Sequence, residues 1–453
     1  MDERIKSDQI VLLLDNYSSD SKKLHQSFQL AGYGYPAAVI EDDGFLPENV
    51  MSVYGFFLGD FKAVKSLPGV PRYFNQIKVP EYWEISGSNR SGSVHDKSKE
   101  RARIFYAEPT HKRLVRIVDW YDERGVVRSS DHYNRYGALY ARTIFNEKGQ
   151  KVNKSYFSAD GKETIVENFV TGDIILNDKD VVRMFRTKTD FVVHFLKAAG
   201  FSQSRIFFNS LSTPFFVSQR LSAGEKKEDV LFWQEPARDD IPGNMMVILN
   251  EQATRTEKIM VQKRHAYDKL IQLGARADMV HRMGFLYPFS KAYTGKPEAL
   301  ICTNSDNIEQ CRKLALELPQ IHFHIAALTE MSSKLMSMGA YSNVSLYPGV
   351  KMKVLDELFD QCDFYLDVNH EAEIVSAVYQ AFLHNQIIFA FEETIHNRDC
   401  VAEAHIYKSN EVNRMISDIK AILESRELAV LHLNMQHDAA LTESKETYQA
   451  FIG

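Results

Sequence analysis

Polar side chains that could bind a ligand follow several apolar segments in the last third of the chain. The segments at 299–302, 322–327, 364–368 and 387–391 have the length and composition of buried parallel strands. Ligands of such sheets meet the carboxyl ends of the strands. After three of these segments the sequence supplies the following candidates: Thr303, Asn304, Ser305, Thr329, Glu330, Ser332, Asn369 and His370. Hydroxyl, amide and imidazole groups can hydrogen-bond a polar ligand, so we interpret them as a candidate binding site.

A second interpretation of the same residues is structural. Ser305, Ser332 and Asn369 each stand where a helix N-cap is needed, and capping alone would explain their presence. The loops also lack the cluster of Arg and Lys, or the glycine-rich helix start, that a nucleotide diphosphate usually requires. The pattern therefore argues against a sugar nucleotide as the ligand.

Patterns that would indicate a cofactor or a metal ion fail on position. Gly32-x-Gly34-x-x-Ala37 resembles a dinucleotide fingerprint, but it follows a predicted helix and precedes a predicted strand, which is the reverse of what pyrophosphate binding needs. His322 and His324 share one face of a strand, yet no third ligand is in register with them. We predict no cofactor and no metal.

The elements that carry these residues alternate between strands and helices. Residues 10–14 and 37–40 are predicted strands with a helix between them, and the same rhythm resumes at about residue 180. Two α/β parts of similar size predict two Rossmann-like halves that face a cleft. The predicted domains are a first Rossmann-like half at 1–72 and 179–280, an inserted sheet at 73–178, a second half at 281–425 and a helical tail at 426–453.

The inserted segment has an internal repeat. Gly125, Gly137, Gly149 and Gly161 are twelve residues apart, and each follows a polar turn that is preceded by an aromatic or apolar pair. Glycine can adopt the positive φ that ends such a turn, so each unit predicts one strand and one reverse turn. We predict an antiparallel meander of at least five strands, and we expect the two halves to fold without residues 96–168.

Charge and aromatic residues are distributed unevenly. The chain carries a formal charge of −6, whereas residues 97–154 hold 14 Lys and Arg against 7 Asp and Glu. Such a segment is either a set of solvated strand faces or a docking surface for an acidic partner, an anionic membrane or a polymer. The whole-chain charge argues against nucleic acid as a partner. Aromatic side chains are expected at the centre of a subunit interface, and the candidates are Trp120, Tyr121, Tyr133, Phe145, Tyr156 and Phe157.

The sequence shows none of the features of an exported or membrane-spanning protein. The apolar run Ile10–Leu14 is too short for a signal-peptide core, and no stretch approaches the ~18–20 apolar residues of a membrane helix. The four cysteines contain no CxxC pair and are expected to be reduced. These observations favour a cytoplasmic protein.

Several blocks of this sequence resemble the GtfB family, the partner subunit of the accessory-Sec O-GlcNAc transferase of Gram-positive bacteria. The resemblance spans nearly the whole chain, in the same order, and rests on LLLDNYSSDSKKLHQSFQLAGYGYP and VIEDDGFLPENVMSVYGFFLG near the start, the Phe74-Asn75…Val79-Pro80…Trp83-Glu84-Ile85 segment, VENFVTGDIIL at 166–176, LFWQEP at 231–236, PGNMMVILN at 242–250, FHIAALTEMSSKLMSM at 323–338 and YLDVNH at 365–370.

The resemblance implies a GT-B fold with an extended sheet inserted in the first half. It also implies a role, because GtfB-type proteins assist a glycosyltransferase. They associate with a catalytic homologue of the GtfA type, stabilise it, and bind the serine-rich repeat adhesin that it modifies with N-acetylglucosamine from UDP-GlcNAc. With this role, the polar strand-end residues named above become candidates for binding the acceptor peptide. We also expect peripheral contact with the inner face of the membrane.

The catalytic pattern of the wider glycosyltransferase family is altered here. Retaining GT-B enzymes of this kind carry a Glu-x7-Glu element, and the matching positions in this chain are Ala372 and Gln380. A methyl group or an amide cannot hold the charge or act as the base that a carboxylate supplies. We therefore predict a non-catalytic subunit. Two alternatives stay open: an active GT-B glycosyltransferase, with Glu371 or Glu373 serving instead, and a peptide-binding chaperone with no obligatory enzyme partner.

Overall fold

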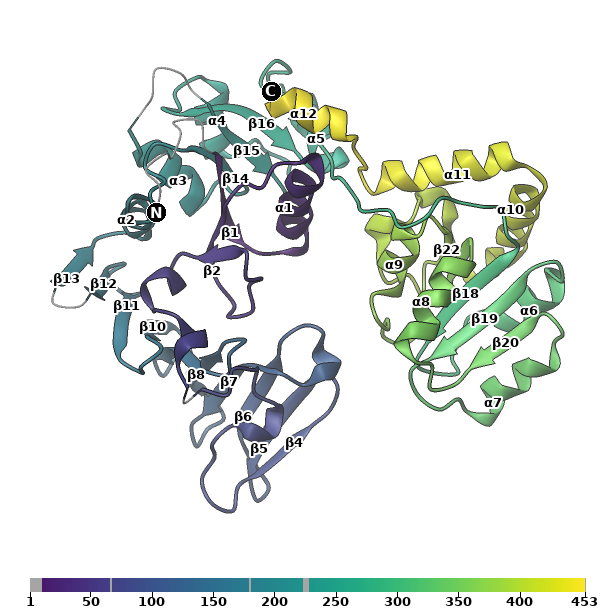
Figure 1. The fold of residues 1–453 in the computed structure, drawn as a ribbon, viewed down its shortest axis with the longest axis horizontal. Helices are drawn as coiled ribbons and strands as arrows, with labels where there is room; N and C mark the ends of the chain where they lie inside the picture. Colours follow the sequence, from purple (N-terminus) through teal and green to yellow (C-terminus); the bar gives the residue numbers. More distant parts are fainter. Residues whose placement is uncertain (1–9, 66, 179–180, 223–227, 453) are drawn as a thin grey trace. The chain divides into compact units, whose positions relative to one another are not determined.

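The computed structural model describes residues 10–65, 67–178, 181–222 and 228–452, and the chain divides into two compact units between Arg282 and Met283 (Figure 1). The first unit contains a parallel sheet and an antiparallel sheet, and the second contains a further parallel sheet. The chain is thus a mixed α/β protein, as predicted.

The first parallel sheet is built from the two predicted flanks of the insertion. In spatial order its strands, as described by the structure, are β17 (Val280–Arg282), β16 (Thr256–Val261), β15 (Asp229–Trp233), β14 (Arg205–Phe208), β1 (Ile10–Asn16), β2 (Ala37–Glu41) and β3 (Val50–Ser52). Its helices are α1 (Ser19–Ala31), α2 (Lys188–Ala198), α3 (Thr213–Arg220), α4 (Gly243–Leu249) and α5 (Arg264–Gln272). The helix α3 was not predicted.

The rejected dinucleotide pattern has a local explanation in α1. Gly32 follows the helix at φ +100°, and its backbone N–H donates to the carbonyls of Gln29 and Phe28. A residue with a β-carbon resists that conformation, so Gly32 ends the helix. The glycine therefore caps a carboxyl terminus and cannot present a helix amino terminus to a phosphate.

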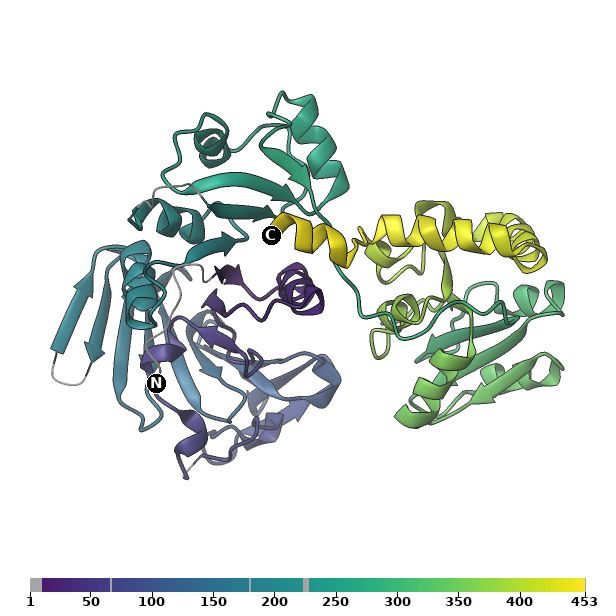
Figure 2. The same ribbon diagram turned by 45° about the horizontal axis from the view of Figure 1, so that its top comes forward.

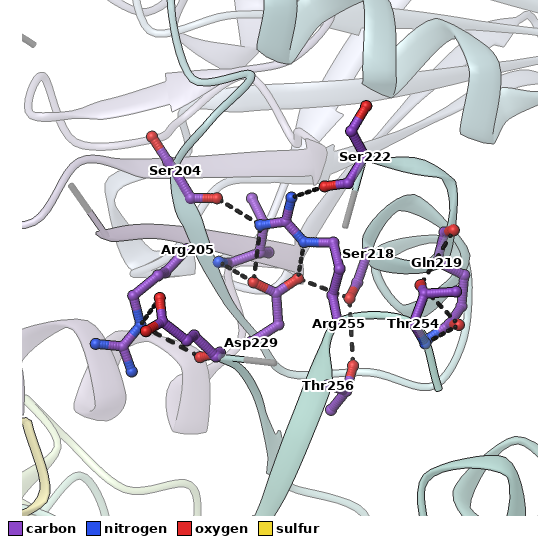
Figure 3. A network of polar contacts seen from close by, with 11 residues as sticks. Ser204, Arg205, Ser218, Gln219, Ser222, Asp229, Thr254, Arg255 and Thr256 are labelled. Atoms are coloured by element: carbon purple, nitrogen blue, oxygen red, sulfur yellow. Dashed lines mark hydrogen bonds and ion pairs between the residues drawn. The ribbon is translucent and has the colours of Figure 1, made fainter. Parts of the chain in front are cut away.

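A buried ion pair joins the strands of this sheet at their amino-terminal ends (Figure 3). The Arg255 guanidinium donates from Nε to Asp229 Oδ2 at 2.8 Å and from Nη2 to Oδ1 at 3.0 Å, and it also donates to the carbonyls of Ser204 and Ser222. The Asp229 carboxylate accepts two more hydrogen bonds, from the Ser218 hydroxyl and the Ile206 backbone N–H, both at 2.8 Å. The side chains of Asp229 and Arg255 are 1% and 10% exposed. This network connects β14, β15, β16 and α3.

The antiparallel sheet is the predicted meander, with more strands than the repeat indicated. In the described chain it runs β4 (Glu84–Gly87), β5 (Ser91–Asp96), β6 (Lys99–Tyr106), β7 (Val115–Tyr121), β8 (Val127–Tyr133), β9 (Leu139–Phe145), β10 (Lys151–Phe157), β11 (Glu163–Asn168), β12 (Ile174–Asp178) and β13 (Val181–Phe185), each beside the next. The four repeat glycines all have positive φ, between +74° and +83°. The twelve-residue interpretation is confirmed.

The two ends of the antiparallel sheet are covered on opposite faces. Tyr156, Ile165 and Leu176, near the β13 end, share one core with the parallel sheet. Ile104 and Val118, near the β4 end, pack instead against Ile77 and its neighbours in the segment before β4. Strand register places Tyr156 on the face of Phe105, and therefore opposite to Ile104. The face that carries Tyr156 is uncovered where it continues toward β4.

This packing corrects two expectations. The boundary predicted at 178/179 falls inside the β12–β13 hairpin, because β13 completes the sheet. The insertion is also not removable, since Tyr140, Tyr156 and Ile165 belong to the core that β1 and β14 share. Deleting residues 96–168 would remove these side chains from that core, so we now expect the deletion to destabilise the first unit. In Figure 1 the β13 end of the antiparallel sheet lies beside α2, and Figure 2 shows the same part of the first unit from another side.

The second unit has one parallel sheet with helices on its faces. Its described strands, in spatial order, are β20 (Val344–Tyr347), β19 (His322–Ala327), β18 (Glu298–Thr303), β21 (Phe364–Asp367), β22 (Ile387–Phe391) and β23 (Ile406–Tyr407). Its helices are α6 (Cys311–Glu317), α7 (Ser333–Met336), α8 (Met352–Gln361), α9 (Ala377–Leu383), α10 (Val412–Glu424), α11 (Arg426–Ala439) and α12 (Lys445–Ile452).

The boundary predicted at 425/426 does not separate a tail from this unit. Ala429 and Leu433 of α11 belong to its core. The Gln436 side chain accepts from the Ile388 N–H at 2.9 Å and donates to the Gln386 carbonyl at 2.9 Å. A buried amide that satisfies the backbone of a sheet strand makes α11 an integral layer. No helix in the described part of the chain has the length and apolarity to cross a bilayer.

Candidate functional site

The predicted polar residues lie together at the carboxyl edge of the second-unit sheet, in the loops that follow β18, β19 and β21. Asn369 is the centre of this edge. Its Oδ1 accepts hydrogen bonds from Thr303 Oγ1 at 3.0 Å and Ser305 Oγ at 3.3 Å, and its Nδ2 donates to the Glu371 carbonyl at 3.0 Å. The amide thus ties the loop after β21 to the loop after β18.

Burial separates these residues into two groups. Thr303 and Asn369 are 0% and 2% exposed, and each hydrogen-bonds within the loops. They hold the loops in place and cannot touch an incoming peptide directly. Exposed or half-exposed side chains of this edge are Asn304, Ser305, Thr329, Glu330, Ser332 and His370. The contact surface is therefore smaller than the sequence suggested.

Ser332 caps a helix, as the structural interpretation of these residues predicted. Its Oγ accepts from the Leu335 N–H at 3.2 Å, which caps α7, and it donates to Asp306 Oδ2 at 2.7 Å. The second bond links the loops after β18 and β19. Asn369 and Ser305 make no such helix cap, since the residues before α6 and α9 are Gln310 and Ser376.

His370 lies at the outer rim of the same edge. Its Nε2 is 2.7 Å from Glu309 Oε2, and its backbone N–H donates to the Asn307 carbonyl. Both contacts join the loop after β21 to the loop before α6. The pair is partly exposed, so it can be reached by a ligand.

A second pair at this edge was missed by sequence reasoning. Asp367, the last residue of β21, is 2% exposed and lies 2.6 Å from His396 Nδ1 through its Oδ1. Its Oδ2 also accepts from the His396 N–H at 2.7 Å. Hydrogen bonding and attraction to Asp367 outweigh desolvation and raise the pKa of His396 to about 9. His396 is therefore a cation at neutral pH, and its charge is neutralised by Asp367.

Asp367 lies within the YLDVNH block that the sequence analysis quoted, but the sequence did not indicate His396 as its partner. His396 follows β22 and is 29 residues away in sequence. Only the pairing of β21 with β22 brings the two together. Because Asp367 neutralises the charge of His396, this histidine adds no unpaired positive charge to the edge.

The two positions that the sequence analysis matched to the Glu-x7-Glu pattern face different surroundings. Ala372 is exposed in the loop before α9, whereas Gln380 is half-buried within α9. Of the neighbouring acids, Glu373 accepts through Oε1 from the Val378 N–H at 2.8 Å, and burial raises its pKa. Glu371 is exposed, and its backbone carbonyl accepts hydrogen bonds from Asn369 Nδ2 at 3.0 Å and from His396 Nε2 at 2.6 Å. Glu373 is thus committed to the start of α9.

Histidines at the opposite end of the sheet have partners of their own. His322 Nε2 is 2.7 Å from Ser345 Oγ, and the two ring nitrogens of His324 approach Tyr347 Oη and Glu298. Across the described residues, no group of three or more His, Cys, Asp or Glu side chains is arranged to hold a metal ion.

The predicted interface aromatics of the antiparallel sheet differ in accessibility. Tyr133 and Tyr156 are 8% and 3% exposed and belong to hydrophobic cores, so neither is available to a partner. Trp120 is half-buried and donates from Nε1 to Asp131 Oδ2 at 3.0 Å. Tyr121, Phe145 and Phe157 are half-buried. Alternation along a strand does not reveal which face is covered, and this is why two of the six were misassigned.

Accessible apolar side chains gather elsewhere on the sheet, along its outer strand. Val182 and Met184 of β13 are 71% and 63% exposed, and Val170 in the turn between β11 and β12 is 74% exposed. Register places Val182 and Met184 on the face opposite to the shared core. An edge strand with bare apolar side chains and unpaired backbone groups is a surface that another chain can cover.

Comparison with known proteins gives consistent matches along the chain. Family models match in four consecutive segments: the GtfB N-terminal domain at residues 11–57, the GtfB middle domain at 83–186, the GtfB third domain at 188–273 and the GftB/GlyA-F C-terminal domain at 299–436. The middle-domain segment coincides with the antiparallel sheet, strands β4 to β13.

Curated relatives match over their full length. The chain is 42% identical over 446 residues to the UDP-N-acetylglucosamine–peptide N-acetylglucosaminyltransferase stabilizing protein GtfB of Streptococcus agalactiae, covering 98% of this chain and 99% of that protein. It is 40% identical over 452 residues to the protein of the same name from Streptococcus gordonii, with the same coverage. A chain of the crystal structure of the GtfA/B complex bound to UDP and GlcNAc matches with a TM-score of 0.86 at 39% identity, over 97% of this chain and 98% of that chain.

Proposed function

The chain belongs to the GtfB family, and from that premise we propose that it is the non-catalytic subunit of a protein O-GlcNAc transferase that stabilises a GtfA-type catalytic subunit. Its relatives carry the name of stabilizing proteins of that transferase. The observation that carries the proposal is the pair Ala372 and Gln380, which puts no carboxylate at either catalytic position. The two units correspond in this proposal to the halves of a GT-B fold.

Turnover assays test this assignment. With UDP-GlcNAc and an unglycosylated serine-rich repeat, we expect no transfer by the chain alone and more transfer by the mixture than by the catalytic subunit alone. In the mixture, Glu371→Ala and Glu373→Ala should each leave turnover within a few-fold, because losing a catalytic carboxylate costs ~10²–10⁴-fold. A loss of that size in either variant, or transfer by the chain alone, would support the active-enzyme alternative.

The second part of the proposal is that the carboxyl edge of the second-unit sheet binds the acceptor polypeptide. A serine-rich repeat is extended and poor in apolar anchors, so it must be held by many weak polar contacts. The exposed side chains of Asn304 and Thr329 suit such contacts. Within the described chain neither side chain makes a hydrogen bond, which leaves both able to bind a peptide. The acceptor is glycosylated in the cytoplasm, before export, in this proposal.

We expect Asn304→Ala combined with Thr329→Ala to weaken binding of an unglycosylated repeat peptide by several-fold, since each lost polar contact is worth about 0.5–1.5 kcal/mol. Fluorescence anisotropy of a labelled peptide measures this. Asn413→Ala combined with Ser417→Ala is the matched control, because it removes an exposed amide and an exposed hydroxyl from α10 of the same unit. Equal midpoints for the wild type and the Asn304/Thr329 variant would move the acceptor site away from this edge.

The third part concerns the partner. We infer that the catalytic subunit covers the outer face of β13, where Val182 and Met184 are exposed. The name of the relatives and the existence of a GtfA/B complex support a hetero-oligomer. Subunit interfaces of stable complexes are centred on apolar side chains that are exposed in the isolated chain.

A further inference from the structure

A cavity of about 510 Å³ lies on the uncovered face of the antiparallel sheet in the first unit, where that face meets β2 and α2. Its volume is in the range of small-molecule sites. None of the residues proposed for peptide or partner binding at the strand ends or on the outer face of β13 takes part in it. The lining residues that the argument uses are Phe105, Arg116, Phe145, Lys151, Lys154 and Phe169.

Three cations of this cavity have no carboxylate at ion-pair distance in the described chain, although Glu41, Glu167 and Asp42 attract Lys154 from farther away. Within the described chain, Arg116, Lys151 and Lys154 make no side-chain hydrogen bond and no ion pair. The Nε of Arg116 is buried without a partner, and burial lowers the pKa of Lys154. Arg116 and Lys154 are half-buried and Lys151 is exposed. Removing a cation from water without a partner is costly unless an anion binds beside it, so this arrangement favours a bound anion.

Lys188, the fourth cation of the cavity, differs from the other three because it forms ion pairs. Lys188 Nζ is 2.5 Å from Glu41 Oε1 and 2.9 Å from Glu167 Oε1, so its charge is neutralised twice. Glu41 and Glu167 are thus paired with Lys188 of α2. The three cations without an ion pair lie on β7 and β10. His132 lies between them and is neutral, because burial and repulsion by the cations lower its pKa to about 3.

Aromatic rings accompany the charges. Phe105 and Phe169 are each 37% exposed, and Phe145 is half-buried. Lys151 Nζ lies 5.6 Å from the centre of the Phe169 ring. Exposed rings beside unpaired cations offer stacking for the flat or ring part of a ligand whose charged group the cations hold. The carboxylates of Glu41, Asp119 and Glu167 complete the lining and can accept hydrogen bonds from hydroxyl groups.

We propose that this cavity binds a phosphorylated sugar, free or within a nucleotide, with its phosphoryl group on Arg116, Lys151 and Lys154, its ring portion against the three phenylalanines, and its hydroxyl groups toward the carboxylates. Three cations match the charge of a phosphoryl dianion better than that of a single carboxylate. The mixed lining of rings and acids distinguishes an organic phosphate from a bare anion. This inference is independent of the function proposed above.

Calorimetry on the full-length chain tests the inference with four probes: glucose 1-phosphate, UMP, inorganic phosphate and glucose. We expect glucose 1-phosphate or UMP to bind at least ~10-fold more tightly than inorganic phosphate, and glucose not to bind measurably. A preference for UMP over glucose 1-phosphate would place a base on the phenylalanines, and the reverse would place a sugar ring there. Absence of binding by both organic phosphates at 10 mM, on the order of the weakest interaction that calorimetry resolves, would overturn the proposal, as would equal affinity for inorganic phosphate.

Variants locate the site. Arg116→Gln combined with Lys151→Gln should weaken the organic phosphate by at least ~10-fold, since each charge-assisted hydrogen bond is worth about 1.5–3 kcal/mol. Lys148→Gln combined with Lys162→Gln removes the same charge from exposed turns of the same sheet and should leave affinity unchanged. A change common to both variants would indicate non-specific attraction and contradict the proposal. In the wild type, the ring signals of His132 should shift on titration, and unmoved signals would place the ligand elsewhere.

Discussion

Replacing Val182 and Met184 together by glutamate is expected to abolish assembly with the catalytic subunit. Both side chains are more than 60% exposed in the isolated chain, at 71% and 63%, so the substitutions should not disturb the fold. In a covered interface the two carboxylates would be buried without partners. Uncompensated buried charges cost several kcal/mol each, and the affinity should fall by ~10²-fold or more. Co-purification from cells that express both chains, followed by sedimentation of the mixture, measures the effect.

The control for this experiment is Leu316→Glu. Leu316 is 55% exposed on α6 of the second unit, so the substitution makes the same chemical change at a site that we do not assign to the partner. This variant should assemble normally. Recovery of the complex at wild-type yield with the Val182/Met184 variant would exclude the outer face of β13 as the contact.

The second large effect is expected at the buried network of Figure 3. Asp229→Ala leaves the Arg255 guanidinium buried without its carboxylate, and it also removes the acceptor of the Ser218 hydroxyl and of the Ile206 N–H. Breaking a buried pair on one side costs about 3–5 kcal/mol. The free energy of unfolding of the first unit should fall by that amount, as measured by denaturant unfolding.

Two comparisons show whether the cost comes from the unpaired charge. Asp278→Ala breaks an exposed pair with Arg276 and should leave the unfolding midpoint nearly unchanged. Asp229→Leu combined with Arg255→Met removes both charges, and it should recover part of the stability that Asp229→Ala loses. If the double variant is less stable than Asp229→Ala, packing and hydrogen bonds outweigh the unpaired charge as the cause.

The sequence by itself determined many of the elements of this protein and their types, although it did not predict α3. Strands such as β18 and β22 are short apolar runs, and the glycines at 125, 137, 149 and 161 mark turns because the backbone there needs positive φ. These signals are local, since each depends on a few neighbouring residues. The sequence also shows directly that residues 372 and 380 are Ala and Gln, neither of which carries a carboxylate, because residue identity needs no structure.

Only the tertiary structure decided which side chains are available. Strand alternation predicts two faces but does not say which is covered, because the covering residues come from distant parts of the chain. Tyr156 is buried by the first parallel sheet, and the same face farther along carries the unpaired Arg116 and Lys151. Asp367 and His396 likewise meet only because β21 lies beside β22. Contacts between residues far apart in sequence depend on strand order and sheet packing, which the local pattern does not encode.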